Sequence, residues 1–217
     1  MLNVTLKKPG LFVTGTDTGV GKTVVACAVA ACLSRAGQRV GVCKPVASGC
    51  GVADGGLVNE DAQLLKHWSK CEQPLEVINP IRYEKPVAPA AAASDSPDWR
   101  VLDQALGELD RSHDCLVIEG VGGLLVPLDV NDPKVAVLDL IRAIGYPVLV
   151  VARAGLGTLN HTAMTVRLLR ESGCKVAGLV VNGGAGGAGG TGGTGGVGVP
   201  GVGDDLSLGS NGDWLER

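Results

Sequence analysis

The chain has 217 residues, of which 45% are apolar, so its length and composition suit a single domain with an ordinary core. Nineteen basic and 22 acidic residues give a net charge of −3, and the basic residues are scattered singly or in pairs, which argues against a nucleic-acid-binding surface. The seven cysteines contain no C-x-x-C pair and no apolar run reaches about 18 residues, so we expect a reduced protein of the cytoplasm without signal peptide or membrane span.

The first predicted elements are a short apolar strand at 11–14 and a helix at 22–36 that ends near Gly37. The segment between them is a glycine-rich loop that ends in Gly-Lys-Thr. In such a loop, backbone N–H groups and the helix N-terminus bind phosphate oxygens, while Lys22 reaches the terminal phosphates and the Thr23 hydroxyl ligates Mg²⁺. The sequence therefore predicts a nucleotide site that includes Gly19, Val20, Gly21, Lys22, Thr23 and Val24.

The rest of the chain alternates between apolar runs and helical patterns. Strands are predicted at 40–43, 116–118, 147–152 and 176–181, and helices at 60–68, 99–109, 133–144 and 160–171. This alternation is typical of an α/β fold in which helices flank a mostly parallel sheet. Ligands of such folds bind beyond the carboxyl ends of the strands, so the residues that follow each strand are the candidates for chemistry.

Lys44 follows the second predicted strand and precedes Pro45, whose ring biases the lysine toward extended backbone. Held there, Lys44 would face the phosphates as a second cation. The alternative is a solvated surface lysine beside a turn, because lysines are usually exposed. Ser48 is a weaker candidate, since serine is common in turns.

Two acidic residues are candidates for holding Mg²⁺. Glu119 ends a buried apolar run and is followed by Gly120, Val121 and Gly122, which let the backbone approach a ligand. Asp61 is a second candidate, but an acid at a helix start is more often a cap or a partner of the helix dipole.

The last two strand ends carry weaker signals. Residues Gly157, Thr158, Leu159 and Asn160 lead into the helix at 160–171, where free N–H groups would hold an anion unless Thr158 or Asn160 simply caps the helix. Asn182 ends the last strand, where it would either read an adenine edge or begin a turn.

Five of these motifs together resemble the dethiobiotin synthetase family, in order and at matching separations. They are residues 15–23, Lys-Pro-Val-Ala-Ser-Gly at 44–49, Asn-Glu-Asp at 59–61, Glu-Gly-Val-Gly-Gly at 119–123, and Gly-Thr-Leu-Asn-His-Thr at 157–162. The Pro-Val-Ala-Pro-Ala-Ala segment at 86–91 is similar to the family's substrate-side loop, although many members have histidine where Ala90 stands. The resemblance covers about residues 10 to 182.

The resemblance implies a P-loop NTPase-like three-layer fold and a homodimer that binds 7,8-diaminononanoate, CO₂ or bicarbonate, and ATP with Mg²⁺. It implies that the enzyme closes a ureido ring to give dethiobiotin, ADP and phosphate through a carbamate and a carbamic-phosphoric anhydride. The resemblance implies that Lys22, Lys44 and Thr18 are the catalytic residues. It also implies that Thr23, Asp61 and Glu119 hold Mg²⁺, so Asp61 would be a metal ligand and not a helix cap or dipole partner. The substrate would bind to Ser48 and, on the other subunit, to Gly157, Thr158, Leu159 and Asn160. Besides the loop residues, ATP would contact Asp61, Glu119, Gly120, Val121, Gly122 and Asn182.

The C-terminal part departs from the family. Residues 183–203 consist largely of glycine triplets that lack side chains for a core, so we expect a flexible segment after the domain at 1–182 and a short polar tail at 204–217. Relatives have further contacts with the adenine base in this part of the chain, and these are missing here. We therefore expect the protein to discriminate weakly between nucleotides.

Three alternatives are a partition-type ATPase, an amidotransferase ligase and a regulatory P-loop ATPase without activity on diamines. The partition type has a lysine five residues before Lys22, where this chain has Asp17. The amidotransferases need a glutaminase domain for which this chain is too short. A regulatory P-loop ATPase can be distinguished from the synthetase only by an assay of ADP release with diaminononanoate and bicarbonate.

Overall fold

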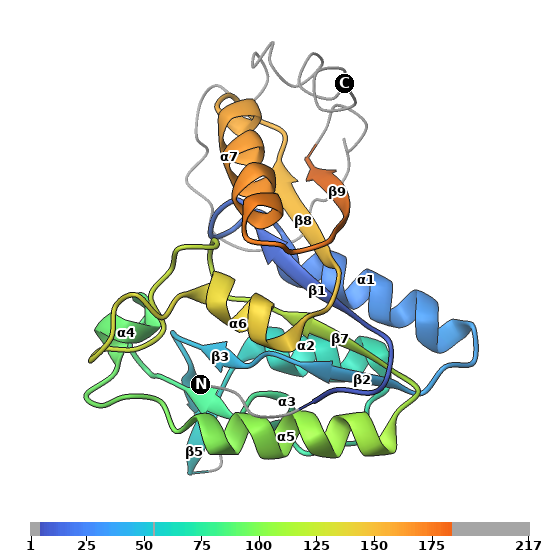
Figure 1. Ribbon diagram of the computed structural model, residues 1–217. Helices are drawn as coiled ribbons and strands as arrows, with labels where there is room; N and C mark the ends of the chain where they lie inside the picture. The colour runs from blue at the N-terminus through green and yellow to red at the C-terminus, as the bar shows by residue number, and fades with distance from the viewer. Residues whose placement is uncertain (1–4, 54, 184–217) are drawn as a thin grey trace, which may run out of the picture.

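A parallel sheet of five strands, in the order β2-β7-β1-β8-β9, forms the centre of the protein (Figure 1). The computed structural model describes residues 5–53 and 55–183, so all of the expected glycine-rich segment except Gly183, and the tail at 204–217, lie outside the described residues. The strands span β1 Gly10–Gly15, β2 Val40–Cys43, β7 Cys115–Glu119, β8 Val148–Arg153 and β9 Val176–Asn182. The predicted α/β fold with a mostly parallel sheet is confirmed.

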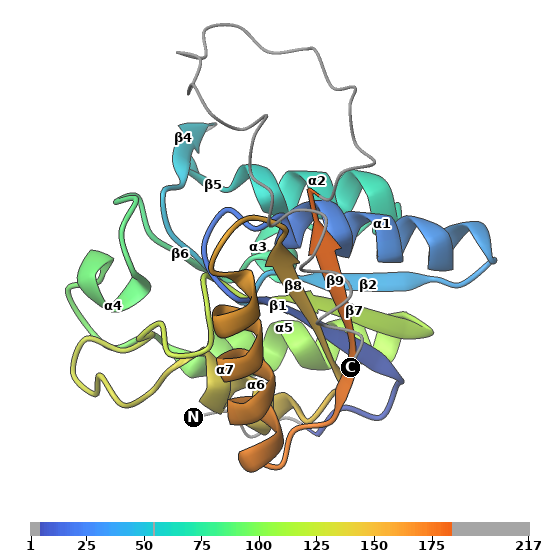
Figure 2. The ribbon, with the colours of Figure 1, turned by 90° about the horizontal axis from the view of Figure 1, so that it is seen from above.

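Helices cover both faces of this sheet (Figure 2). The helices α1 and α2 lie on one side, and α5, α6 and α7 lie on the other. Their bounds are α1 Lys22–Arg35, α2 Glu60–Ser69, α5 Trp99–Ser112, α6 Val137–Ile144 and α7 Thr158–Glu171. None of the helices among the described residues combines the length and the apolar character that a membrane crossing requires.

Several short elements escaped prediction because they are shorter than the windows over which hydrophobic periodicity can be recognised. They are α3 Leu75–Ile78, α4 Pro89–Ala92, and two small pairs of strands, β3 Val46–Ala47 with β6 Ile81–Arg82 and β4 Gly51–Ala53 with β5 Gly56–Val58. Together they form the region beyond β2 through which the chain passes between Lys44 and α5.

The core lies on both faces of the sheet, as expected for parallel strands covered by helices. Phe12 in β1 lies opposite Ile118 of β7 and Val148 of β8, and all three side chains are fully buried. On α5, the fully buried Leu102, Leu106 and Leu109 recur at helical spacing and form its inward face. This packing fixes the carboxyl ends of β1, β2 and β7, where the candidate site begins.

The helix predicted at 133–144 was wrong in its first turn, because α6 begins only at Val137. Val135 N–H closes a turn on the carbonyl of Asp132 at 3.0 Å, and Ala136 forms an antiparallel bridge with Pro127. The Ala136 N–H also donates to the Asp139 carboxylate at 3.0 Å, which starts the helix one residue later. Local pairing with the preceding loop therefore competes successfully with helix formation at 133–136.

Candidate functional site

The phosphate-binding loop connects β1 to α1, with its glycines in conformations that other residues rarely adopt. Gly19 has φ +74° and Gly21 has φ +96°. Gly21 precedes α1, and no side chain of the described residues caps this helix end, so its first N–H groups are available to an anion. Lys22 Nζ donates to the carbonyl of Asp17 at 2.8 Å, which folds the lysine back over the loop.

Lys44 is held at the end of β2 by neighbours that the sequence did not reveal. Its N–H donates to the carbonyl of Ile78 at 2.7 Å, and its own carbonyl accepts from Asn79 Nδ2 at 2.6 Å. The residue is only 4% exposed, so the alternative of a solvated surface lysine is wrong. Lys44 Nζ donates to the carboxylates of both Asp61 and Glu119, at 2.8 Å in the case of Glu119.

The Lys44 ammonium and the carboxylates of Asp61 and Glu119 shift one another's pKa values. Burial by itself lowers the pKa of Lys44, but Glu119 and Asp61 more than offset this effect and leave its pKa raised. Burial also works to raise the pKa of Asp61, yet the Lys44 ammonium brings it below its usual value. Glu119 is fully buried, and burial raises its pKa despite the opposing effect of Lys44. Burial lowers the pKa of the nearby Lys22.

Glu119 also meets the phosphate-binding loop. Thr23 Oγ1 donates to Glu119 Oε1 at 2.8 Å, so β7 and the start of α1 are joined across 96 residues of sequence. The other carboxylate oxygen, Oε2, is buried and has no hydrogen-bond partner among the described residues. A buried carboxylate oxygen without a partner is costly and is commonly explained by a missing ion or water.

Asp61 does not cap α2, although it lies in the first turn. That role belongs to Asn59, whose side chain accepts from the Ala62 N–H at 3.2 Å. The Asp61 carboxylate instead accepts from Lys44, so the alternative of a cap is wrong, while its place in the first turn of α2 still suits a partner of the helix dipole.

A cavity of about 1040 Å³ lies over these groups and brings most of the expected site residues together. Its lining includes the loop, the lysine and carboxylate cluster and the turn after β7. The expected residues found there are Thr18, Gly19, Gly21, Lys22, Thr23, Val24, Lys44, Ser48, Asp61, Glu119, Val121 and Gly122.

Other expected residues do not line this cavity. Val20 and Gly120 lie behind its wall, and Asn182 lies at the end of β9, where its side chain contacts the loop. The start of α7 lies elsewhere, with Gly157 and Asn160 exposed and Thr158 buried against Thr162. Within residues 5–53 and 55–183 no side chain caps α7, so the alternative that Thr158 or Asn160 caps it is wrong.

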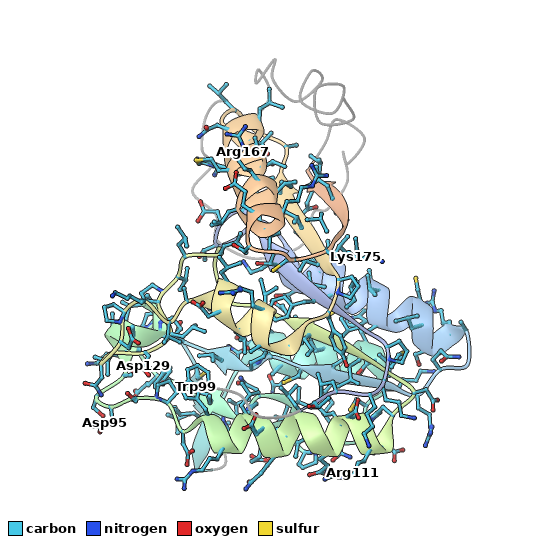
Figure 3. All side chains as sticks on the ribbon, in the orientation of Figure 1. Asp95, Trp99, Arg111, Asp129, Arg167 and Lys175 are labelled. Carbon is cyan, nitrogen blue, oxygen red and sulfur yellow. The ribbon has the colours of Figure 1, made fainter. Side chains whose placement is uncertain are left out.

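Another wall of the cavity comes from the segment that resembles the substrate-side loop. Pro86, Val87, Ala88 and Pro89 line it. The segment is fixed from behind, because Ala90 N–H donates to the carbonyl of Pro127 at 3.2 Å and Ser96 Oγ donates to Asp129 at 2.6 Å. Figure 3 shows Asp129 near Trp99 at this end of the molecule, far from Arg167 on α7.

Sequence reasoning missed a second, apolar part of the cavity. It runs between α1 and α2 and is lined by Cys27, Ala28, Ala31, Cys32, Leu64 and Trp68, with Arg35 at its end. Leu64 and Trp68 are about half exposed, at 46% and 48%. The apolar residues Leu64 and Trp68 on the exposed side of α2 were the available sign of this part of the cavity. The pattern of α2 alone, however, does not show that α1 lies opposite them.

Comparison with known proteins places these features in a family. A family model described as an AAA domain matches residues 9–188. The ATP-dependent dethiobiotin synthetase BioD of Anaeromyxobacter sp. (strain K) is 48% identical over 177 residues, which cover 80% of this chain and 76% of the relative. BioD of Thermodesulfovibrio yellowstonii is 38% identical over 182 residues, which cover 81% and 76%. BioD of Bacillus licheniformis is 40% identical over 177 residues, which cover 80% and 73%.

Among solved structures, the kinase domain of Escherichia coli tyrosine kinase ETK aligns with 81% of this chain and 68% of its own, at 16% identity and a TM-score of 0.49. That likeness is too distant to bear on function. The assignment depends instead on relatives that are similar over most of their length, together with a phosphate-binding loop beside a lysine and two carboxylates. On these grounds, the chain belongs to the ATP-dependent dethiobiotin synthetase family.

Proposed function

We propose that this protein closes the ureido ring of dethiobiotin from 7,8-diaminononanoate, CO₂ and ATP. The observation that carries the proposal is the position of Lys44, which lies buried between Asp61 and Glu119 in the same cavity as the phosphate-binding loop. Family membership supports ATP as the co-substrate. We infer the roles of the single residues from the chemistry of the side chains that line the cavity.

The reaction requires positioning and charge stabilisation, and it requires no nucleophilic side chain. One amine of the substrate adds CO₂ to form a carbamate, whose oxygen then accepts the γ-phosphoryl group of ATP. The second amine attacks the resulting anhydride, phosphate leaves, and the five-membered ring closes. Lys22 and Lys44 would hold the γ-phosphate and the carbamate, while Thr18 and Ser48 would donate hydrogen bonds to the reacting groups. This division of labour is how phosphoryl transfer is generally catalysed.

The residues present also fit Mg²⁺. A magnesium ion prefers oxygen ligands, usually one or two carboxylates together with water and substrate phosphates. Thr23, Asp61 and Glu119 supply three such side chains, and the buried Oε2 of Glu119 lacks a partner among the described residues. When bound there, Mg²⁺ would neutralise charge on the β- and γ-phosphates.

We expect Asp61→Asn and Glu119→Gln each to raise the Mg²⁺ concentration required for half-maximal activity. Each change removes a negative charge but keeps the shape of the side chain. A titration of initial rate against Mg²⁺ at saturating ATP measures the effect, and Glu60→Gln, on the exposed neighbour of Asp61, serves as the control. An unchanged Mg²⁺ dependence in both variants would remove the two carboxylates from the metal site.

The second part of the proposal is a homodimer in which the start of α7 completes the partner's site. Gly157 and Asn160 are exposed and lie outside the cavity of their own chain. We propose further that the far carboxylate of the substrate binds at this helix start, so Asn160→Asp would place a negative charge beside it. A mixture of two variants expected to be inactive tests the arrangement, with Lys44→Met in one chain and Asn160→Asp in the other. If the dimer shares its sites, the mixture recovers part of the activity, and absence of any recovery in mixed dimers speaks against shared sites.

The deciding experiment is a coupled assay of ADP release with diaminononanoate and bicarbonate, combined with detection of dethiobiotin by mass spectrometry. Synthesis of dethiobiotin in a fixed ratio to ADP is the expected result. ADP release that does not depend on the diamine would favour the alternative of a regulatory P-loop ATPase.

A further inference from the structure

Asn182 connects the last strand of the sheet to the phosphate-binding loop. Its backbone is fixed at the end of β9, opposite Arg153 of β8, and its carbonyl accepts from the Ala154 N–H at 3.0 Å. From there its side chain Nδ2 donates to the carbonyl of Val20 at 3.0 Å, across 162 residues of sequence. The end of β9 lies beside the start of α1 (Figure 2).

This contact acts on one particular peptide group. Because the peptide between Val20 and Gly21 is planar and trans, its C=O and N–H point in opposite directions. The Val20 carbonyl is directed toward Asn182, so the Gly21 N–H is directed away from it, and Gly21 lines the cavity. Asn182 thereby favours the peptide orientation in which this N–H is offered to an anion.

Close packing supports the same role. A Cβ atom placed on Gly21 would lie 2.1 Å from Asn182 Nδ2, so the amide rests directly against the glycine. With φ at +96°, Gly21 adopts a left-handed conformation that glycine takes up readily and that would strain any other residue. The asparagine therefore contacts both the carbonyl and the α-carbon that set the shape of the loop at this point.

We propose that Asn182 is a positioning residue for the phosphate-binding loop, which acts on the triphosphate through the Val20–Gly21 peptide. The proposal rests on the nucleotide-binding part of the proposed function. It differs from a base contact in one measurable respect, because a positioning residue affects every ligand with a triphosphate, whereas a base contact affects only ligands with a base. The exposed remainder of the Asn182 side chain leaves space for a base, so the experiment must separate these roles.

The test compares binding of ATP and of inorganic tripolyphosphate, each with Mg²⁺, by titration calorimetry. We expect Asn182→Ala to weaken both ligands by the same factor, about threefold to tenfold, the usual effect of losing one hydrogen bond. Asn182→Leu keeps bulk against Gly21 but cannot donate, and it should give the same pattern. Val181→Ala, one residue earlier on β9, is the control and should leave both dissociation constants unchanged, and melting curves without ligand verify folding.

Weaker ATP binding with unchanged tripolyphosphate binding would show a base contact alone and overturn the proposal. Unchanged binding of both ligands, or a wild-type protein that binds neither, would also overturn it. A protein that binds tripolyphosphate as expected but makes no dethiobiotin would contradict the proposed reaction and leave the role of Asn182 standing.

Discussion

Lys44→Met is expected to lower turnover by at least about a hundredfold, the range found when a major charge-stabilising group is removed from an active site. Lys44 is the cation closest to both carboxylates and is nearly fully buried, so solvent ions cannot replace it efficiently. Methionine keeps most of the side-chain length but removes the ammonium, with its charge and its hydrogen bonds to Asp61 and Glu119. Steady-state rates at saturating ATP and diamine measure the effect directly.

The fold of this variant has to be verified, because the substitution leaves Glu119 buried without its counter-ion. Circular dichroism and thermal melting provide the check. The matched control is Lys175→Met, which removes an exposed lysine from the loop before β9 and should leave turnover unchanged (Figure 3). Wild-type turnover by a folded Lys44→Met protein would exclude Lys44 from the mechanism.

Phe12→Ala should lower the free energy of unfolding by about 3–5 kcal/mol, the usual cost of truncating a buried aromatic side chain. Phe12 is the single phenylalanine of the chain and is fully buried in the central strand β1. Its ring also supports the site, because a Cβ atom on Gly120 would lie only 3.0 Å from Phe12 Cε1. In a protein of this size, the loss corresponds to a melting temperature lower by about 10 °C.

Phe12→Leu is the control, since it keeps most of the buried volume and should cost less than about 1.5 kcal/mol. Denaturant unfolding of both variants gives the comparison. If Phe12→Ala changed the unfolding free energy by less than about 0.5 kcal/mol, as surface substitutions do, the assignment of Phe12 to the core would be incorrect.

The sequence was most informative where structure is encoded locally. The loop at 15–23 has a strand before it and a helix after it. The run that precedes Lys44 and the run that ends at Glu119 are buried along their whole length, so each feature was recognisable from a short window. Because all five central strands are parallel, their carboxyl ends meet at one edge, which explains why residues from distant motifs line one cavity.

What could not be predicted depends on contacts between distant segments. No hydrophobic period in the sequence indicates the order of the strands. The same is true of two hydrogen bonds, from Asn79 to the Lys44 carbonyl and from Asn182 to the Val20 carbonyl. The start of α6 failed for the same reason, because the bridge between Pro127 and Ala136 decides it. Asp61 shows the limit clearly: its position suggested a cap, but Asn59 two residues earlier had already taken that role.

The two ion pairs of Lys44 bear on the net charge that an incoming ligand meets. One ammonium faces two carboxylates, those of Asp61 and Glu119, so these three side chains together carry a charge of −1 when all of them are ionised. Under the proposed function, a bound triphosphate would offer the ammonium new partners, and Mg²⁺ would then meet both carboxylates without a competing cation. Such an exchange of partners would make the affinity for the metal depend on the nucleotide.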